Sequence, residues 1–191
     1  MKSVNNLKIC LAGKNEIAIY GLKLLLKKID KDNIYILTNS TDFGYDTWQP
    51  SLLKFAKEKR LNLINIEECY RLKNIIFLSL EYDKLINPNK FLSDRLYNIH
   101  FSKLPYYKGM FTSAWPLINN ETKSGVTLHR IDNGIDTGEI IDQITFNIKN
   151  IKTSKELYCL YLNYSKKLIH KNLDNILKNK IKSRPQPSTG S

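Results

Sequence analysis

The stretch from Asn98 to Gly138, NIHFSKLPYYKGMFTSAWPLINNETKSGVTLHRIDNGIDTG, carries the most informative residues of this chain. It begins inside an apolar run, LYNIHF, in which Asn98 and His100 are two positions apart. Because side chains alternate between the two faces of a β-strand, this spacing sends both side chains to the same face. Asp136 follows later, in a glycine-bearing loop. An amide, an imidazole and a carboxylate at strand ends and loops can activate an amine and stabilise an oxyanion.

Upstream of this stretch, short apolar runs alternate with amphipathic segments. We expect strands at residues 7–12, 34–39, 61–66, 74–80 and 96–101, and helices at residues 16–30 and 51–60. Strands that alternate with helices are typical of a parallel sheet. The sequence therefore predicts an α/β fold: a Rossmann-like core with a mixed, mostly parallel sheet and helices on both faces.

The first predicted strand ends at Gly13, before Lys14 and Asn15. This turn matches neither G-x-G-x-x-G nor a Walker A loop, so it gives no support to a nicotinamide dinucleotide or ATP site. Two interpretations of Lys14 and Asn15 are open. They contact a substrate phosphate at the start of the next helix, or Gly13 only makes the turn and Lys14 is solvated.

Downstream, the runs at residues 126–131 and 139–146 flank the loop that holds Asp136. They read as an antiparallel pair or as two successive strands. Residues 153–180 form a helical pattern that opens with a capping box, Thr153 to Glu156. We expect one catalytic domain over residues 1–181, and a Pro/Ser/Gly tail at 182–191 that starts a missing C-terminal extension.

Composition narrows the class of protein. At 42% hydrophobic residues the chain is ordinary for a globular domain. The net charge of +12 comes from Lys scattered along helical faces, so no nucleic-acid partner is expected. Three cysteines without C-x-x-C spacing predict neither a disulfide framework nor a zinc site. No apolar run approaches a membrane span and no signal peptide is visible, so cytoplasmic residence without a membrane partner is expected.

The motifs N-x-H-x-S-x-L-P, Y-K-G, S-A-W-P, S-G-V-T-x-H and D-x-G-x-D-T-G-x-I occur here in that order. This series resembles the formyltransferase family that uses 10-formyltetrahydrofolate. The segments FSKLP, YKGMFTSAWP and HRIDNGIDTG are most similar to the branch that formylates amino sugars on a nucleotide diphosphate carrier. A weaker likeness runs from about residue 7 to about residue 147.

The resemblance implies three catalytic residues. His100 would act as a base toward the amine or as a donor to the oxyanion, and Asn98 would donate an amide N–H to the formyl oxygen. Asp136 would hold the imidazole or a relayed water and favour the protonated histidine. Neither a protein nucleophile nor a metal is expected, since the amine attacks the formyl carbon directly. His129 is interpreted as a support for these residues or as a core residue.

The resemblance also suggests which residues hold the two substrates. A loose match puts a pterin-contacting loop after the fourth strand, at Leu80, Glu81, Tyr82 and Asp83. Candidates on the acceptor side or in the loop after the catalytic strand are Lys14, Asn15, Trp48, Lys103, Tyr107 and Lys108. Trp48 either anchors a helix or stacks on a base or sugar. The loop side chains either clamp a pyrophosphate or folate tail, or are ordinary exposed charges. Trp115, in a short helix after Ser113, is expected to be structural.

The implied reaction moves a formyl group from 10-formyltetrahydrofolate to the amine of a dTDP-3- or 4-amino-dideoxyhexose, for surface polysaccharide such as O-antigen of lipopolysaccharide. The expected partners are the nucleotide sugar and folate, with a homodimer if the C-terminal extension is present. Two alternatives remain: a formyltransferase acting on a tRNA-linked amine or a ribonucleotide, and a catalytically idle nucleotide-binding module.

Overall fold

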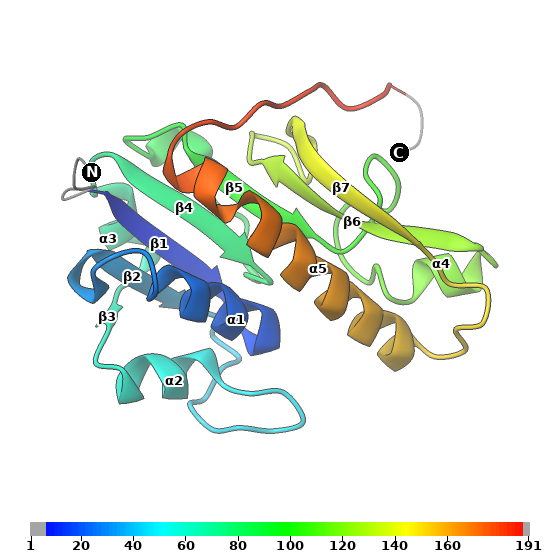
Figure 1. The fold of residues 1–191 in the computed structure, drawn as a ribbon, viewed down its shortest axis with the longest axis horizontal. Coiled ribbons are helices and arrows are strands. Elements are labelled where there is room, and N and C mark those ends of the chain that lie inside the picture. Colours follow the sequence, from blue (N-terminus) through cyan, green and yellow to red (C-terminus); the bar gives the residue numbers. More distant parts are fainter. Residues whose placement is uncertain (1–6, 189–191) are drawn as a thin grey trace. The chain divides into compact units, whose positions relative to one another are not determined.

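The computed structural model describes residues 7–188. The chain divides into two compact units, Met1–Tyr97 and Asn98–Ser191 (Figure 1). The boundary falls within β5 (Leu96–His100), so this strand begins in the first unit and ends in the second. Within the described residues, no helix is both long enough and apolar enough to cross a membrane.

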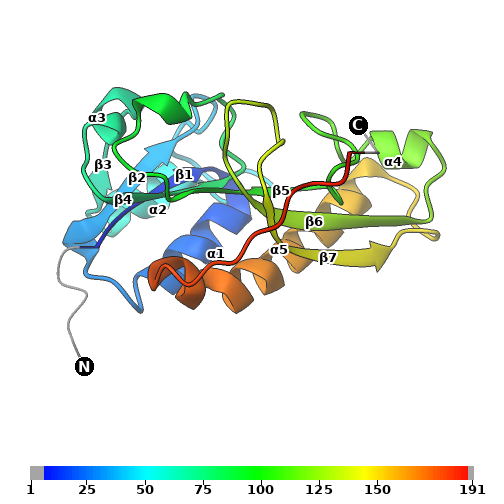
Figure 2. The same ribbon diagram turned by 90° about the horizontal axis from the view of Figure 1, so that it is seen from above.

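The first unit is a parallel sheet covered by helices. Its elements are β1 (Lys8–Gly13), α1 (Asn15–Leu25), β2 (Ile34–Thr38), α2 (Leu52–Glu58), β3 (Asn62–Leu63), α3 (Ile66–Tyr70) and β4 (Ile75–Leu80), with single 3-10 turns at Lys31–Asn33 and Pro88–Lys90. The strands lie in the order β3-β2-β1-β4, followed by the start of β5. In the view from above, α1 and α3 lie on opposite faces of this sheet (Figure 2). All six residues of β4 are buried, as expected for a strand covered on both faces.

The second unit continues the sheet from the end of β5. It contains α4 (Trp115–Ile118), β6 (Lys123–Arg130), β7 (Ile140–Asn147) and α5 (Ser154–Leu177). β6 pairs with β7 in antiparallel register, with an irregularity between Leu128 and His129. The long helix α5 packs against both strands. Its first turn is closed by the predicted capping box, in which Thr153 and Glu156 each accept from the other's backbone N–H.

The complete strand order, β3-β2-β1-β4-β5-β6-β7, confirms the predicted mixed and mostly parallel α/β fold. The runs beside Asp136 are an antiparallel pair, which decides between the two sequence interpretations. One strand was predicted too long, and one helix was not predicted. Only two residues of the run at 61–66 pair as a strand, and the chain turns there into α3, which the sequence pattern did not indicate. α3 starts with its own capping box, from Asn65 to Glu68.

The predicted Pro/Ser/Gly tail at 182–191 makes one backbone pairing that its composition did not indicate. Arg184 forms an antiparallel bridge with Ile140, at the start of β7. Residues 189–191 of the predicted tail lie outside the described residues. The expectation of one catalytic domain over 1–181 remains a prediction.

The turn after β1 can be occupied only by glycine. Gly13 has φ +155°, and a Cβ built on it would lie 1.8 Å from the carbonyl oxygen of Leu80 at the end of β4. The next residue, Lys14, donates its backbone N–H to that same oxygen at 3.3 Å. Gly13 thus lets the backbone after β1 approach the end of β4, which fixes where Lys14 and Asn15 begin helix α1.

Candidate active site

One largely buried carboxylate organises the polar residues around it in the second unit. Asp136, whose side chain is 13% exposed, lies in the loop between β6 and β7 with φ 52°. Its Oδ1 accepts from Asn98 Nδ2 at 3.2 Å, and its Oδ2 accepts from the Gly109 N–H at 2.9 Å. His100 Nδ1 lies 3.3 Å from Oδ2, and His129 Nε2 lies 3.3 Å from Oδ1. The structure therefore brings Asn98, His100 and Asp136 together, as their sequence positions suggested.

These contacts favour the ionised form of Asp136. Burial has the largest effect and raises the pKa of this carboxyl group, because the charged form loses its hydration. The hydrogen bond with His129, the charge of His100 and the Gly109 N–H act in the opposite direction. Together they lower the pKa of Asp136 to about 2. Asp136 is thus a fixed negative charge at neutral pH.

His100 lies between two acceptors. Its Nε2 is 2.7 Å from the carbonyl oxygen of Tyr107, and its Nδ1 faces Asp136. A carbonyl oxygen can only accept, so Nε2 carries a proton in the form that keeps this contact. Burial lowers the pKa of His100, while the Asp136 charge and the Tyr107 carbonyl oppose that shift. A neutral ring that leaves the Tyr107 carbonyl can carry its one proton on Nδ1, toward Asp136, and take up a second proton at Nε2. The imidazolium that forms is paired with a carboxylate.

His129 adds a second imidazole to the cluster. Its Nδ1 lies 2.6 Å from the Arg130 carbonyl oxygen, which makes Nδ1 the donor. Its Nε2 lies 3.1 Å from Asn98 Nδ2 and also faces Asp136. A neutral His129 accepts from the amide of Asn98, which orients that amide. The His129 ring is 2% exposed and contacts both Asn98 and Asp136, so it supports the cluster rather than packing in a separate core.

The loop after β5 closes over these residues. The Tyr107 side chain, one of the candidates for holding substrate, donates to Glu121 at 2.8 Å and accepts from Asn119 at 3.0 Å. Its part in the cluster comes instead from the backbone carbonyl that faces His100. Lys103 is exposed and Lys108 is half-buried. The contact of Gly109 with Asp136 was not foreseen from the sequence, because it depends on the positive φ of 81° at this glycine.

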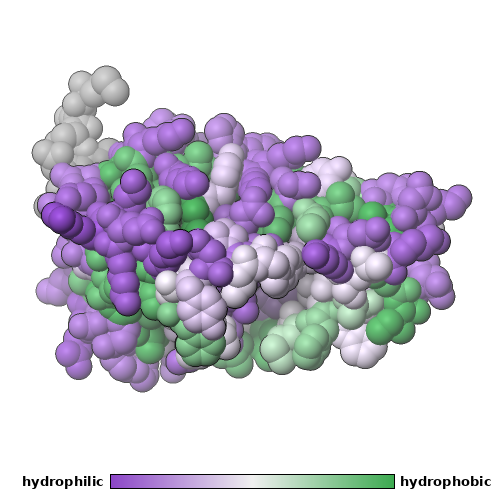
Figure 3. Space-filling model, turned by 90° about the horizontal axis from the view of Figure 1, so that it is seen from below, coloured by the Kyte–Doolittle hydropathy of each residue, from purple (hydrophilic) through white to green (hydrophobic). Residues whose placement is uncertain are grey.

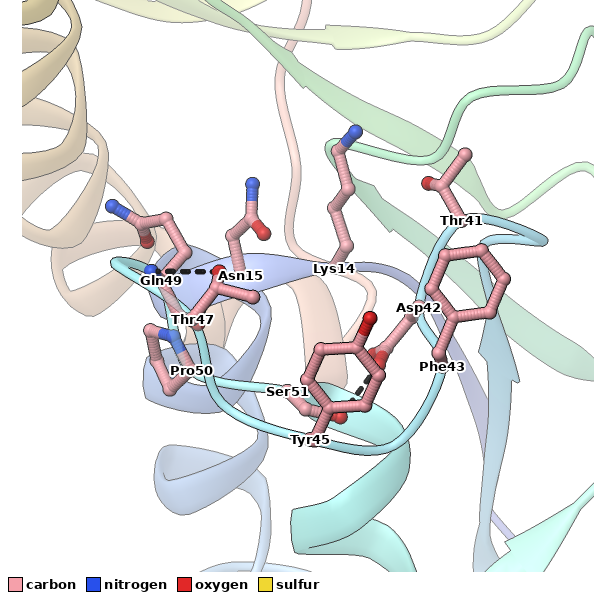
Figure 4. A pocket seen from close by; sticks show the side chains of 10 residues that line it. All are labelled: Lys14, Asn15, Thr41, Asp42, Phe43, Tyr45, Thr47, Gln49, Pro50 and Ser51. Atoms are coloured by element: carbon pink, nitrogen blue, oxygen red, sulfur yellow. Dashed lines mark hydrogen bonds between the residues drawn. The ribbon is translucent and has the colours of Figure 1, made fainter.

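The first unit has a cavity of about 190 Å³ beside the start of α1 (Figure 4). Its lining residues are Lys14, Asn15, Thr41, Asp42, Phe43, Tyr45, Thr47, Gln49, Pro50 and Ser51. The close-up shows the side chains of Lys14 and Asn15 extending in the same direction, with the rings of Phe43 and Tyr45 on the facing loop. These two rings are stacked, with centroids 6.2 Å apart.

Hydrogen bonds hold the loop that carries these rings. Asp42 accepts from the Ser51 hydroxyl at 2.5 Å and from the Leu53 N–H at 2.9 Å, and Asp46 accepts from the Ser51 N–H at 2.9 Å. Trp48 is 63% exposed, which is at odds with an anchor packed in a core, and it is not among the lining residues. The aromatic groups that do line the cavity, Phe43 and Tyr45, were missed in the sequence.

The other predicted residues are placed as follows. Leu80 is fully buried at the end of β4. The next residue, Glu81, has φ 62°, and its backbone carbonyl accepts a hydrogen bond from Asn39 Nδ2 at 2.8 Å. Tyr82 is half-buried and Asp83 is exposed, and burial raises the pKa of Tyr82 to about 12. Trp115 is 47% exposed, so the expected structural role has little packing to support it.

Comparisons with known proteins place this fold and cluster in a family. A family model described as formyl transferase matches residues 65–173. The structure of an N-formyltransferase from Helicobacter canadensis, in complex with folinic acid and dTDP-3-aminofucose, is 48% identical with a TM-score of 0.95, over 97% of this chain and 69% of that one. WlaRD, a sugar 3N-formyl transferase solved in the presence of dTDP and 5-N-formyl-THF, is 49% identical with a TM-score of 0.95, over 97% of this chain and 68% of that one.

Curated relatives are more distant. The bifunctional polymyxin resistance protein ArnA of Wigglesworthia glossinidia brevipalpis is 32% identical over 92% of this chain, and a methionyl-tRNA formyltransferase of Bacteroides fragilis is 33% identical over 47%. The chain spans 28% of the length of each of these two proteins. The family model covers more than half of the chain, in the part that contains Asn98, His100 and Asp136. This protein belongs to the formyl transferase family.

Proposed function

We propose that the protein is an N-formyltransferase that moves a formyl group from 10-formyltetrahydrofolate to the amine of a nucleotide-linked amino sugar. The observation that carries this proposal is the buried Asp136 carboxylate with Asn98 and His100 beside it. The two structures that share nearly half of its residues were solved with a folate and with dTDP or a dTDP-amino sugar. Both similarities extend over 97% of the chain.

The reaction needs few groups from the protein. The amine nitrogen attacks the formyl carbon, the bond from that carbon to the folate nitrogen breaks, and the proton lost by the amine returns to the folate nitrogen. Neutral His100 accepts this proton during the transfer, because Asp136 stabilises the resulting imidazolium. The Tyr107 carbonyl lies on a partly exposed loop whereas the Asp136 side chain is only 13% exposed, so Nε2 is the ring nitrogen that exchanges its partner for substrate. The neutral ring then has its proton on Nδ1, facing Asp136, and Nε2 accepts the proton of the amine.

The negative charge that develops on the formyl oxygen needs a donor. The resting Asn98 amide gives its two N–H groups to His129 Nε2 and Asp136 Oδ1, so it supplies the formyl oxygen by exchanging one of these partners for it. Removing one such donor typically costs about a hundredfold in rate. Asp136 therefore contributes by holding the amide of Asn98 as well as by its charge.

The cavity of the first unit suits the nucleotide part of the acceptor. Lys14 and Asn15 offer a cation and an amide where α1 begins, and the positive end of the helix dipole favours phosphate oxygens there. Phe43 and Tyr45 offer ring surfaces on which a base can stack. We assign Lys14 and Asn15 to the pyrophosphate and this pair of rings to the base. The candidates for contacts with the sugar and folate are the exposed Trp48 and Lys103, the half-buried Lys108 and the loop from Leu80 to Asp83.

We further propose a cytoplasmic enzyme that supplies formylated sugars for surface polysaccharide and works as a homodimer. Exposed apolar side chains support association: in the second unit Met110, Phe111 and Ile118 are 75%, 70% and 63% exposed. The face seen from below carries apolar patches between its polar side chains (Figure 3). Patches of this kind often mark contacts with other proteins.

An assay for tetrahydrofolate release tests the activity and the acceptor together. We expect turnover with a dTDP-3- or dTDP-4-amino-dideoxyhexose, and little with glycinamide ribonucleotide or methionyl-tRNA. Turnover mainly on either of the latter two would move the protein to another branch of the family. Binding of dTDP without formyl transfer to any amine in the panel would show that the proposed activity is wrong.

His100→Ala should lower kcat at least about a hundredfold, because the amine loses its proton acceptor. The matched control is His170→Ala, which removes an imidazole from an exposed position of α5 and should leave kcat within about twofold of the wild type. Steady-state kinetics, with circular dichroism as a check on folding, measure both. Near wild-type kcat in His100→Ala would remove this residue from the mechanism.

Lys14→Ala should raise KM for the nucleotide sugar about tenfold or more and change KM for folate little, because a lost charged contact to phosphate weakens binding by roughly 1.5–3 kcal/mol. Lys73→Ala, which removes an exposed Lys of the same unit, is the control for net charge. Equal effects of the two variants would mean that Lys14 acts only through the overall charge of the protein.

A further inference from the structure

The last described residues form a short strap on the second unit. We call residues 183–186 the C-terminal strap. Arg184 exchanges two backbone hydrogen bonds with Ile140, at 2.8 and 2.9 Å. The Ser183 hydroxyl donates to Glu139 Oε2 at 2.5 Å and accepts from Arg130 Nε at 3.1 Å. In both ribbon views this red segment runs along the start of β7 (Figures 1 and 2).

Gln186 ends the strap and reaches the loop that carries Asp136. Its Nε2 donates to the backbone carbonyl of Asp136 at 2.7 Å and to that of Gly138 at 2.8 Å. A glutamine amide has two N–H groups, so both are used on this one loop. Its Oε1 is buried without a hydrogen-bond partner among the described residues. Burying an amide oxygen without a hydrogen bond destabilises the folded protein, so we expect the two hydrogen bonds of Nε2 to offset this cost.

The loop needs an external support at this point. Asp136 has φ 52°, a left-handed conformation that is unfavourable for a residue with a Cβ atom. The bonds inside the loop hold its first part: Asp132 Oδ1 accepts from the Gly134 N–H at 3.1 Å and from the Thr137 hydroxyl at 2.6 Å. The carbonyls of Asp136 and Gly138 turn the other way, toward Gln186. The same backbone conformation directs the Asp136 carboxylate toward His100.

We propose that Gln186 is a positioning residue for formyl transfer: it fixes the backbone of Asp136 from outside the cluster and so sets the place of the carboxylate beside His100. This inference rests on the proposed function only for its effect on turnover. The strap itself touches neither His100 nor Asn98 in any contact described, so its influence passes through Asp136.

The test uses two substitutions of Gln186 in the full chain. Gln186→Glu keeps the size of the side chain but replaces both N–H groups by a carboxylate that repels the two carbonyls, and Gln186→Ala removes the contact. Lys182→Ala changes an exposed residue just before the strap and serves as the control. We expect kcat to fall roughly tenfold or more in both Gln186 variants, with KM for each substrate within about twofold of wild type, because two hydrogen bonds are lost at about a factor of ten or less each.

Nuclear magnetic resonance titration of the histidine rings gives a readout that does not need turnover. Because the Asp136 charge holds up the pKa of His100 against burial, a displaced carboxylate lowers that pKa. We expect a lower pKa of His100 in Gln186→Ala and none of this change in Lys182→Ala. An unchanged titration together with wild-type kcat in both Gln186 variants would overturn the inference. Absence of formyl transfer by the wild type would refute the proposed function instead, and the titration would still decide whether Gln186 positions Asp136.

Discussion

Asp136 is a negative charge that burial alone would neutralise, and the second unit is built so that it stays ionised. Its polar neighbours come from separate parts of the chain: Asn98 and His100 on β5, Gly109 in the following loop and His129 on β6. Asn98, His100 and Gly109 are 27 or more residues from Asp136 in sequence, and His129 is seven residues away. A buried carboxylate with such partners cannot move without leaving several polar groups unpaired, which costs more than the net value of any one bond. The polar contacts within the cluster therefore resist displacement of this carboxylate.

This arrangement explains how one imidazole can accept a proton in a buried place. Burial disfavours the charged form of His100, and the negative charge of Asp136 stabilises that form once the ring is protonated. The ring is neutral before the reaction and stabilised after it takes the proton. Amide formation from an amine needs such a group, which accepts a proton for a short time and gives it back.

Much of the fold and part of the site could be predicted from the sequence. The alternation of strands and helices, the capping box of α5 and the shared face of Asn98 and His100 are local patterns that a reader can count. The contacts that depend on loop geometry could not be predicted. Gly109 donates its backbone N–H to Asp136, and every residue type except proline has this group, so the residue type at position 109 does not reveal the contact.

Long-range contacts also explain why the loop that carries Phe43 and Tyr45, and the C-terminal strap, could not be predicted. The hydrogen bonds of Asp42 and Asp46 turn Phe43 and Tyr45 to the cavity, whereas Trp48, the more conspicuous residue, is not part of its lining. Arg184 and Gln186 lie in a segment rich in proline and serine, where composition suggests no structure. Their pairing with β7 and with the Asp136 loop is a long-range contact, set by the fold and not by local propensity.

The most direct measurement is the pKa of Asp136 in the folded protein, obtained from the carboxyl carbon shift as pH is lowered. We predict no titration from neutral pH down to pH 4, and a midpoint at about 2. Because the pKa in the unfolded chain is higher, ionised Asp136 stabilises the fold above pH 4, and this stabilisation disappears as pH falls through the folded pKa. A midpoint at or above the ordinary value of 3.8 would contradict the account, since the donors would then not be holding a charge.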